Sequence, residues 1–335
     1  MNPALLGLVT ILIGVGACVG YFYGANLLLD KVLFPARGPN AGRNINRANM
    51  IRPWIFLFPA LFALGLYLAY PVVETFRLSL MERLPGGREQ FVGFENYSRM
   101  FGEDKFWEAV RNNILWLIVV PAASTGFGLL AAQLTDRLSW GNIAKSIIFM
   151  PMAISLVGAS VIFKLVYEAR PEGTPQIGIL NHIYVNWFGG DPQQWLQIPF
   201  WNNFFLMVVL IWIQTGFAMV ILSAALRGIP EETVEAAIVD GAGPFTIFFK
   251  IKVPQIMSTI VVVWTTITIA TLKVFDIVFA MTNGQWGTQV LANYMYDKLF
   301  RSFDVGVGSA SAMIIMLMVM PILVWNVRNA RKEMR

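Results

Sequence analysis

Long uninterrupted apolar stretches dominate this sequence. Several of them reach the length of about 20 residues that a helix needs to cross the hydrocarbon core of a bilayer. Seven such stretches lie at 4–24, 54–73, 114–132, 146–166, 204–224, 259–281 and 309–327. The chain is 56% hydrophobic and 13% charged, whereas soluble domains carry about 25% charged residues. Because the stretches lack the alternation typical of barrel strands, we predict an all-α membrane protein with about seven transmembrane helices.

Some residues within these stretches allow two interpretations. Prolines in the stretches could bend the helices or act as functional hinges, and we favour bends that neighbouring helices tolerate. They are Pro59, Pro71, Pro121, Pro151 and Pro321.

The single Cys18 cannot form an intramolecular disulfide, and the single His182 cannot build a multi-histidine metal site. No metal centre is predicted, and the net charge of +5 is not gathered into a stripe that would indicate nucleic-acid binding.

The basic residues predict how the chain is oriented. Residues 31–52 contain Lys31, Arg37, Arg43, Arg47 and Arg52 and no acid, which favours a cytoplasmic linker between the first two stretches. The amino terminus and the loops at 74–113, 167–203 and 282–308 then lie outside. The loops at 133–145 and 225–258 and the carboxyl terminus, with its basic tail, lie in the cytoplasm. The first stretch lacks a basic segment before it, so we expect a retained helix rather than a removed signal peptide.

Two outer loops contain further signals. Residues 91–113 have a helix-compatible pattern of acids, bases and aromatics. The loop at 167–203 contains Trp187 and Trp195, and Trp201 follows close to its end. For these tryptophans we favour a belt at the membrane interface over contacts to a ligand.

The inner segment VEAAIVDGAGPFTIFFKIKVPQI, residues 234–256, is typical of two short helices joined by a glycine turn. A proline followed by two acids at 230–232 predicts a helix start, and glycines followed by a proline at 241–244 predict its end. Alanines beside Glu235 and Asp240 favour docking into a groove of another protein. The alternative is a helix on the bilayer surface, which the acidic character of the first helix disfavours.

The same segment resembles the EAA loop of ABC importer permeases. The matching positions, at the family's spacing, are Glu235, Ala236, Ala237, Gly241, Ile251, Val253 and Pro254, with Val253 in place of the family's leucine. The resemblance continues through RPWIFLFPALFALGLYLAYPVVETFRLSL at 52–80, FVGFENY, NNILW and TNG at 282–284, and it covers roughly residues 50–330. It is similar to MalF-like carbohydrate-uptake permeases, nearest to alpha-glucoside permeases. The large periplasmic insertion of MalF has no counterpart in the short segment 74–113.

This resemblance implies a multi-pass permease subunit in the bacterial inner membrane that imports a sugar or oligosaccharide. It implies a six-helix core at 51–335 with a cytoplasmic coupling loop at 228–256, preceded by one extra transmembrane helix and a basic linker at 1–50. The implied partners are a cytoplasmic ABC ATPase dimer, a second homologous permease and a periplasmic sugar-binding protein. The residues implied to contact the ATPase are Glu235, Ala236, Ala237, Asp240, Gly241, Ile251 and Pro254.

Nucleotide chemistry is expected in the partner rather than in this chain. The sequence contains no GxxxxGK followed by Ser or Thr, which is the loop that cradles nucleotide phosphates. The resemblance implies that the ATPase binds ATP and Mg²⁺, and that this chain needs no cofactor and is not an enzyme.

The substrate pathway is predicted on the spans that flank the inner segment. The resemblance places sugar contacts near Ile213, Gln214, Phe217 and Thr271. Independently, Gln214, Thr215, Lys273 and Asp276 are polar residues in apolar spans, where such groups usually face a cavity or one another. Lys273 and Asp276 could pair on one helix because they are three positions apart. A structural ion pair and a substrate contact both remain open for them.

Two other classes of function, a stand-alone transporter and a membrane enzyme, make different demands on the sequence. A stand-alone ion-coupled transporter would need inverted repeats with matching broken helices, and the sequence shows no such repeat. A membrane enzyme would need paired acids or histidine at a membrane face, for which Asp276 and His182 are the candidates. The alternative substrates to an alpha-glucoside are trehalose, glycerol phosphate and another oligosaccharide. A phosphate substrate should require more basic residues in the pathway than Lys273 alone.

Overall fold

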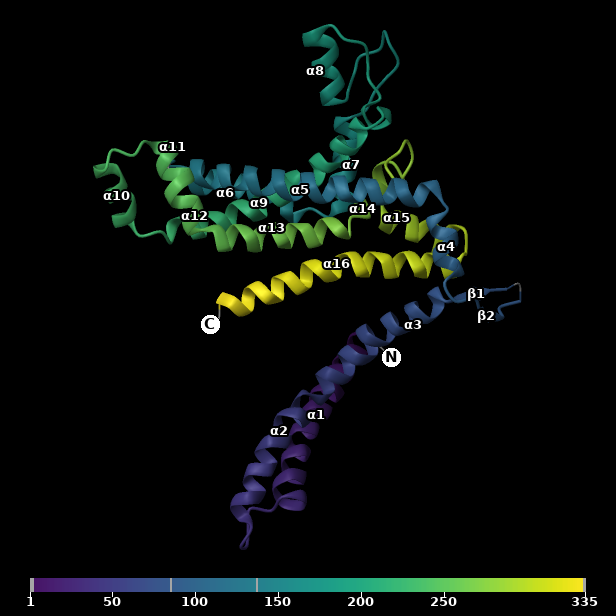
Figure 1. Cartoon of the computed structure of the whole chain (residues 1–335), viewed down its shortest axis with the longest axis vertical. Coiled ribbons are helices and arrows are strands. Elements are labelled where there is room, and N and C mark those ends of the chain that lie inside the picture. Colours follow the sequence, from purple (N-terminus) through teal and green to yellow (C-terminus); the bar gives the residue numbers. More distant parts are fainter. Residues whose placement is uncertain (1–2, 85, 137, 334–335) are drawn as a thin grey trace. The chain divides into compact units, whose positions relative to one another are not determined.

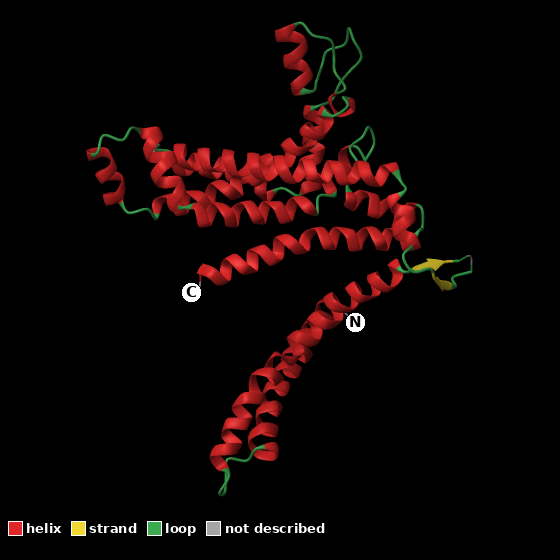
Figure 2. Ribbon diagram, viewed as in Figure 1, coloured by secondary structure: helices red, strands yellow, loops and turns green. Residues whose placement is uncertain are grey.

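The computed structural model describes residues 3–84, 86–136 and 138–333, and most of these residues are helical. Figure 2 shows that helices, joined by loops, make up nearly all of the chain. The only sheet within the described residues is an antiparallel hairpin of β1 (Met81–Arg83) and β2 (Glu89–Phe91), in which Met81 pairs with Phe91. Contacts divide the chain into two units, Met1–Glu74 and Thr75–Arg335, which are described separately.

The first unit is a pair of long helices. α1 (Pro3–Leu27) continues into the π-helical segment η1 (Leu28–Leu33), and α2 (Ala41–Leu64) continues through η2 (Gly65–Ala69) into α3 (Tyr70–Ser79). The Tyr21 hydroxyl donates a hydrogen bond of 2.7 Å to the Ile55 carbonyl, and Arg52 pairs with Asp30 at 2.6 Å. These contacts hold α1 and α2 side by side across the basic linker.

The second unit contains the remaining elements (Figure 1). After the hairpin they are α4 (Glu95–Phe101), α5 (Asp104–Thr135), α6 (Gly141–Phe149), η3 (Met150–Ala153), α7 (Leu156–Val166), α8 (Ile179–Phe188), η4 (Trp195–Gln197), α9 (Trp201–Arg227), α10 (Glu231–Val239), α11 (Pro244–Thr246), η5 (Ile247–Lys252), α12 (Val253–Gln255), α13 (Met257–Leu272), α14 (Asp276–Met281), α15 (Leu291–Tyr296), η6 (Asp297–Arg301) and α16 (Val305–Glu333). The segment at 91–113 contains α4 and the start of α5, as its pattern predicted.

The core of the second unit forms around α9, which packs against α5, α6 and α13. Leu206, Met219 and Leu222 of α9 are fully buried there. Gly128 of α5 permits the close approach, because a Cβ at this position would overlap Ala218 and would lie 2.9 Å from the Met219 nitrogen. Small residues allow membrane helices to approach closely, so α5 and α9 pack tightly against each other.

Five described helices are long and apolar enough to span a membrane, and the number rises to seven if each of two bent helix pairs is one span. The predicted all-α fold with about seven membrane helices is confirmed. The shapes of two predicted spans are different from the prediction. Gly141–Ala153 and Leu156–Val166 meet at a bend of 104°, so the predicted span 146–166 is a sharply bent pair of helices rather than one continuous helix. Pro151 lacks an N–H donor, and Ser155 starts the new helix by accepting a hydrogen bond of 3.1 Å from the Gly158 N–H.

The predicted span 259–281 is also interrupted. α13 ends at Leu272, and α14 begins at Asp276. Phe275 leaves helical geometry with φ −136° and ψ −57°. Val274 in the interruption and Ile277 of α14 both lie in the core, where they are 4% and 0% exposed. Because residues 272–276 contain neither proline nor glycine, the sequence offered no breaker at this point.

Other prolines lie within continuous helices, as favoured from the sequence. Pro59, Pro121 and Pro321 are inside α2, α5 and α16. The tryptophans of the outer loops separate into two kinds. Trp187 and Trp201 are 74% and 58% exposed, whereas Trp195 packs against the core, with its ring 5.4 Å from that of Phe205. Trp195 is therefore a packing residue and differs from the expected belt.

Asparagines of α5 hold the loop at 282–290, which joins α14 to α15. Asn112 donates hydrogen bonds to the carbonyls of Gly287 and Gln289 at 2.9 and 2.8 Å. Asn113 accepts a hydrogen bond of 2.8 Å from the Leu291 N–H. These bonds satisfy backbone groups that the loop could not satisfy by itself.

A second pair of asparagines comes from the first turn of α9. Asn202 donates to the Trp286 carbonyl at 2.6 Å, and Asn203 donates to the Gly287 carbonyl at 3.2 Å. Thr288 of the loop is fully buried. The two pairs therefore tie the 282–290 loop to the ends of the two central helices.

Candidate functional site

The loop at 228–256 forms two short helices around a glycine turn, as predicted. Pro230 precedes α10, and the first turn of α10 contains Glu231 and Glu232, where acids favour the positive end of the helix dipole. α10 ends at Val239, and the Ala242 N–H donates to the Ala237 carbonyl at 2.9 Å. Figure 1 shows α10 and α11 at one end of the second unit.

Gly241 gives the turn its direction. Its φ of +80° lies in the left-handed region, which glycine adopts without steric cost. No atom lies within 4 Å of the position that a Cβ would occupy, so backbone conformation rather than crowding requires glycine here. After the turn, Pro244 starts the second helix, Pro244–Gln255, which meets α13 at a bend of 72°.

The residues predicted to contact an ATPase lie close together on this loop, mostly at its surface. Glu235, Ala236, Asp240, Gly241 and Pro254 are exposed, Ile251 is half-buried, and Ala237 is 7% exposed. Ala237 faces inward, as does Ile247 of η5. The small side chain at Ala237 thus serves packing within the loop, and the other members remain available to a partner.

Large apolar side chains surround these residues on the outside of the loop. We call Ile238, Val239, Phe245 and Phe249 the apolar patch; they are 58%, 86%, 82% and 61% exposed. None of these four side chains was among the residues predicted to contact a partner. Contiguous exposed apolar surface rimmed by polar residues marks interaction sites.

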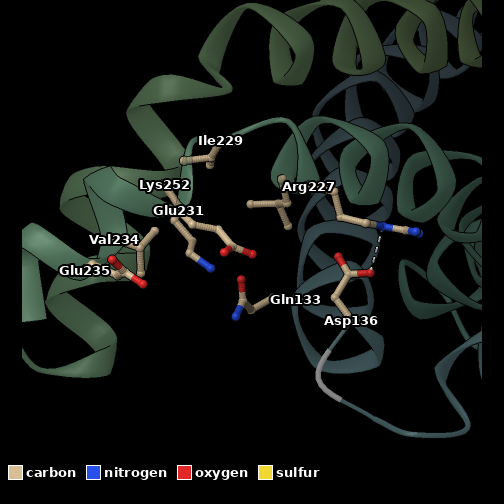
Figure 3. Close-up of a pocket in the computed structure, with 9 residues that line it drawn as sticks. Gln133, Asp136, Arg227, Ile229, Glu231, Val234, Glu235 and Lys252 are labelled. Atoms are coloured by element: carbon tan, nitrogen blue, oxygen red, sulfur yellow. Dashed lines mark ion pairs between the residues drawn. The ribbon is translucent and has the colours of Figure 1, made fainter.

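A pocket of about 570 Å³ lies behind the loop. Its lining residues, most of which are charged or polar, are Gln133, Asp136, Leu226, Arg227, Ile229, Glu231, Val234, Glu235 and Lys252. Figure 3 shows the Glu231 carboxylate and the Lys252 ammonium turned toward the same space, with Arg227 and Asp136 on the opposite side. The pocket therefore separates α10 and η5 from the ends of α5 and α9.

Asp136 links three helix ends beside this pocket. Its carboxylate forms an ion pair with Lys145 of α6 and lies 3.3 Å from the Arg227 Nε at the end of α9. The Ser223 hydroxyl donates to it at 3.0 Å and accepts from Lys145 at 2.8 Å. The side chains of Asp136 and Lys145 are 19% and 13% exposed. Asp136 was not among the predicted site residues, because two of its partners, Ser223 and Arg227, lie far from it in the sequence.

The residues predicted for a substrate pathway are not equally accessible. Ile213 is 6% exposed and Thr271 is fully buried, and the Thr271 hydroxyl donates to the Ile267 carbonyl of its own helix at 2.8 Å. The Thr215 hydroxyl likewise donates to the Ile211 carbonyl at 2.7 Å. Gln214 and Phe217 are half-buried. In this structure, Ile213 and Thr271 are core residues.

Lys273 and Asp276 lie on either side of the interruption that separates α13 from α14. Their expected placement one turn apart on a single helix is therefore wrong. Within the described residues, no ion pair joins them. Lys273 is exposed, and Asp276 is half-buried at the start of α14. Both remain available to a ligand or a partner, and their role stays a prediction.

No group of three or more His, Cys, Asp or Glu residues that could hold a metal ion occurs among the described residues. His182 instead lies within hydrogen-bond distance of Asn186, at 3.0 Å from Nδ1. Cys18 is a free, exposed thiol.

Comparison with known proteins decides the family. Residues 124–330, which include the whole loop at 228–256, match the binding-protein-dependent transport system inner membrane component family. This chain belongs to that family. It is a transmembrane permease subunit of an ABC importer, and not an enzyme or a stand-alone ion-coupled transporter.

Individual relatives of this permease agree with the family. It is 60% identical to the alpha-glucoside transport system permease protein AglF of Rhizobium meliloti (strain 1021), with 99% of each chain covered. It is 47% identical to the osmoprotective compounds uptake permease protein GgtC of Synechocystis sp., with 83% of this chain and 99% of GgtC covered. A chain from the crystal structure of a bacterial ABC transporter involved in alginate import has the same fold, with a TM-score of 0.72 at 20% identity over 87% of this permease and 98% of that chain.

Proposed function

We propose that this permease forms half of the membrane pathway of an ATP-driven importer for alpha-glucosides. The observation that carries the proposal is the 60% identity to AglF along nearly the whole chain. The proposed pathway residues are Ile213, Gln214, Thr215, Phe217, Thr271, Lys273 and Asp276. Among them Ile213 and Thr271 are buried and would need the core to open before they could touch sugar, whereas the other five are half-buried or exposed.

The proposal includes three partners. A cytoplasmic ABC ATPase dimer, which would bind ATP and Mg²⁺, docks on the loop at 228–256. A second homologous permease completes the pathway. A periplasmic sugar-binding protein delivers substrate to the outer loops, and an alginate transporter of the same fold has been crystallised with its periplasmic protein.

The geometry of the loop at 228–256 supports its role in coupling. The apolar patch and the exposed Glu235 and Asp240 stand on one short helix-turn-helix unit. Behind it, the pocket of about 570 Å³ leaves room for movement relative to α5 and α9. Closure of the ATPase dimer would displace the loop, and α13, which follows it directly, would carry the displacement toward the pathway.

The proposed location is the bacterial inner membrane, with the amino terminus outside and the loop at 228–256 and the carboxyl terminus in the cytoplasm. In this proposal, residues 1–50 supply the extra helix and the basic linker, and residues 51–335 supply the permease core. Orientation can be tested by labelling a Val239→Cys variant in a Cys18→Ser background with a membrane-impermeant maleimide. Labelling in inside-out vesicles but not in intact spheroplasts is expected, and the reverse pattern would overturn the orientation.

Substrate and energy source can be tested together. The complete importer, reconstituted with its ATPase, second permease and binding protein, should accumulate maltose or sucrose when ATP is supplied on the ATPase side. The beta-linked disaccharide cellobiose and glycerol phosphate serve as controls. Accumulation of glycerol phosphate but none of the alpha-linked sugars would reject the proposed substrate, and uptake driven by an ion gradient without ATP would reject the mechanism.

A further inference from the structure

Four aromatic rings converge where the chain enters and leaves the 282–290 loop. We call Phe275, Phe279, Tyr296 and Phe300 the aromatic cluster. Phe275 and Phe279 are stacked, with centroids 5.0 Å apart and an interplanar angle of 24°. The Tyr296 ring lies 5.2 Å from Phe275, 5.1 Å from Phe279 and 5.0 Å from Phe300.

The aromatic cluster forms part of the wall of a cavity of about 360 Å³. The lining residues come from the end of α13, the interruption, α15 and α16; they are Lys273, Phe275, Ala292, Met295, Tyr296, Ala312 and Ile315. The volume falls within the range of roughly 300–1,000 Å³ typical of small-molecule sites. Phe275 and Tyr296 belong to both the cluster and the cavity, so two of the rings are accessible from the cavity.

Cationic groups stand at the edges of this apolar surface. Lys273 lines the cavity, and among the described residues its ammonium group forms no hydrogen bond or ion pair. The Arg301 guanidinium lies 5.8 Å from the centroid of Phe279 and 5.9 Å from that of Tyr296, and its charge is balanced by Asp297 at 3.1 Å. Lys273 is therefore the group in the cavity wall with donors to spare, since an ammonium offers three.

We propose that the cavity, the aromatic cluster and Lys273 form a saccharide subsite that holds one pyranose ring of the substrate. This inference rests on the proposed function and deepens it. The rings of Phe275 and Tyr296 would stack against the apolar C–H face of the sugar, as aromatic rings pack on apolar surface generally. Lys273 would donate hydrogen bonds to hydroxyl groups at the edge of the sugar.

The combination of surfaces favours a sugar over a purely apolar occupant. A lipid chain or an apolar helix of a second permease would cover the rings but would leave the Lys273 ammonium without a partner, and burying an unpaired charge is costly. A pyranose presents an apolar face and a rim of hydroxyls to the same pocket. The subsite shares Lys273 with the proposed pathway residues, and its other lining residues, such as Phe275 and Tyr296, lie outside that set.

Accessibility of the cavity provides a direct test. In a Cys18→Ser background, Ala312→Cys places a thiol on the cavity wall, and maleimide labelling of this thiol is measured in the complete reconstituted importer. Maltose, or another alpha-glucoside that the importer transports, should slow the labelling, whereas cellobiose should not. A thiol that is blocked with and without sugar whenever the second permease is present would overturn the proposal in favour of a protein occupant.

Substitution of Tyr296 separates stacking from hydrogen bonding. Tyr296→Leu should raise the sugar concentration that gives half-maximal uptake about three- to tenfold and should abolish the protection, because the stacking surface is lost. Tyr296→Phe keeps the ring and should retain both. The matched control is Tyr67→Leu, which removes an exposed ring in the first unit and should change neither measurement.

The outcomes distinguish this inference from the proposed function. If the unaltered importer accumulates alpha-glucosides while sugar leaves the labelling unchanged and Tyr296→Leu transports with the same half-saturating concentration, the subsite is rejected and the proposed function stands. If the unaltered importer accumulates no alpha-glucoside, both are rejected. If maltose slows the labelling of Ala312→Cys and Tyr296→Leu abolishes this protection, both the subsite and the proposed function are supported.

Discussion

The loop at 228–256 and the loop at 282–290 show two ways of treating a connection between membrane helices. Each contains glycine in the left-handed region, Gly241 with φ +80° and Gly284 with φ +71°. In the 282–290 loop, Thr288 is fully buried and Gln289 is 2% exposed. In the 228–256 loop, Val239 is 86% exposed. The 282–290 loop is therefore packed and bonded within its own chain, whereas the 228–256 loop leaves apolar side chains exposed.

Polar side chains make this difference. Asn112, Asn113, Asn202 and Asn203 each bond to the backbone at 286–291. Nearby, burial raises the pKa of the Tyr294 hydroxyl, and its hydrogen bond to Glu103 adds to the effect. The ion pairs of Asp136 lie behind the 228–256 loop and tie the helix ends rather than the loop itself. A loop built to move with a partner needs such freedom, because mobile elements are those with few buried contacts.

The largest effect on sugar uptake is expected from substitutions in the exposed 228–256 loop. Glu235→Lys reverses a charge on the exposed face of α10 and should abolish sugar uptake, because a docked ATPase would meet the opposite charge. Gly241→Asp should do the same by straining the left-handed turn. Both variants should insert into the membrane at normal levels, since no span is altered.

The matched control for Glu235→Lys is Glu232→Lys, which makes the same charge change in the first turn of the same helix. ATP-dependent uptake and the amount of ATPase that co-purifies with the permease are measured for each. Normal uptake by both Glu235→Lys and Gly241→Asp would contradict the coupling role of the 228–256 loop.

The buried 282–290 loop should be destabilised by the loss of a single asparagine. Asn112→Leu removes the donor to the Gln289 carbonyl and one of two donors to the Gly287 carbonyl, which keeps its bond from Asn203. Because a buried unsatisfied group costs about 1–3 kcal/mol, we expect the variant to lose about 1–3 kcal/mol of stability, seen as a lower midpoint of thermal unfolding in detergent. Asn186→Leu, at an exposed asparagine, is the control and should leave the midpoint nearly unchanged. Equal midpoints for the two variants would show that the asparagines do not hold the loop.

The sequence predicted these two regions unequally. Proline, paired acids and glycines are local signals, so the helix-turn-helix unit at 228–256 was predicted from its own residues. The asparagine pairs were visible as NN at 112–113 and 202–203, at the ends of apolar spans where polar residues need partners. Their partners lie 84 or more positions away, and no local pattern reveals a contact of that kind.

The same limit explains the two broken spans and the Asp136 cluster. Pro151 predicted a bend, but a proline does not predict the angle of the bend, which is 104° here. The interruption at 273–275 has no breaker residue, and the packed structure alone shows it, with Val274 and Ile277 both buried there. Asp136 was one acid in a short loop until α6 and α9 brought Lys145 and Ser223 beside it.

Asp136 tests whether the helix ends behind the open loop must act together. Asp136→Asn keeps the shape of the side chain but removes the charge that Lys145 and Arg227 share. Because hydrogen bonds to charged groups contribute about 1.5–3 kcal/mol and the site is partly exposed, we expect a loss of about 1–2 kcal/mol in stability. Uptake should fall more than ATP hydrolysis by the assembled complex.

A double-mutant cycle supplies the control for this prediction. Lys145→Met alone should also destabilise the permease, and combining it with Asp136→Asn should cost less than the sum of the two single changes. Strictly additive losses would show that the ion pair contributes nothing to holding α5 and α6 together.

The smallest effect on the permease itself is expected at the apolar patch. Val239→Ser changes a side chain that is 86% exposed, so it should alter the stability of the isolated permease by less than about 0.5 kcal/mol. If a partner covers the patch, the same change should weaken ATPase binding about tenfold, because burying a valine side chain is worth roughly 1.5 kcal/mol. Binding is measured by titrating the detergent-solubilised permease pair with its ATPase. Thr288→Val tests the opposite expectation, since Thr288 is fully buried and bonded to Thr282 at 2.7 Å: it should lower stability and leave ATPase binding unchanged. If Val239→Ser binds the ATPase normally, the open loop is exposed for some reason other than docking, and the contrast between the two loops loses its functional meaning.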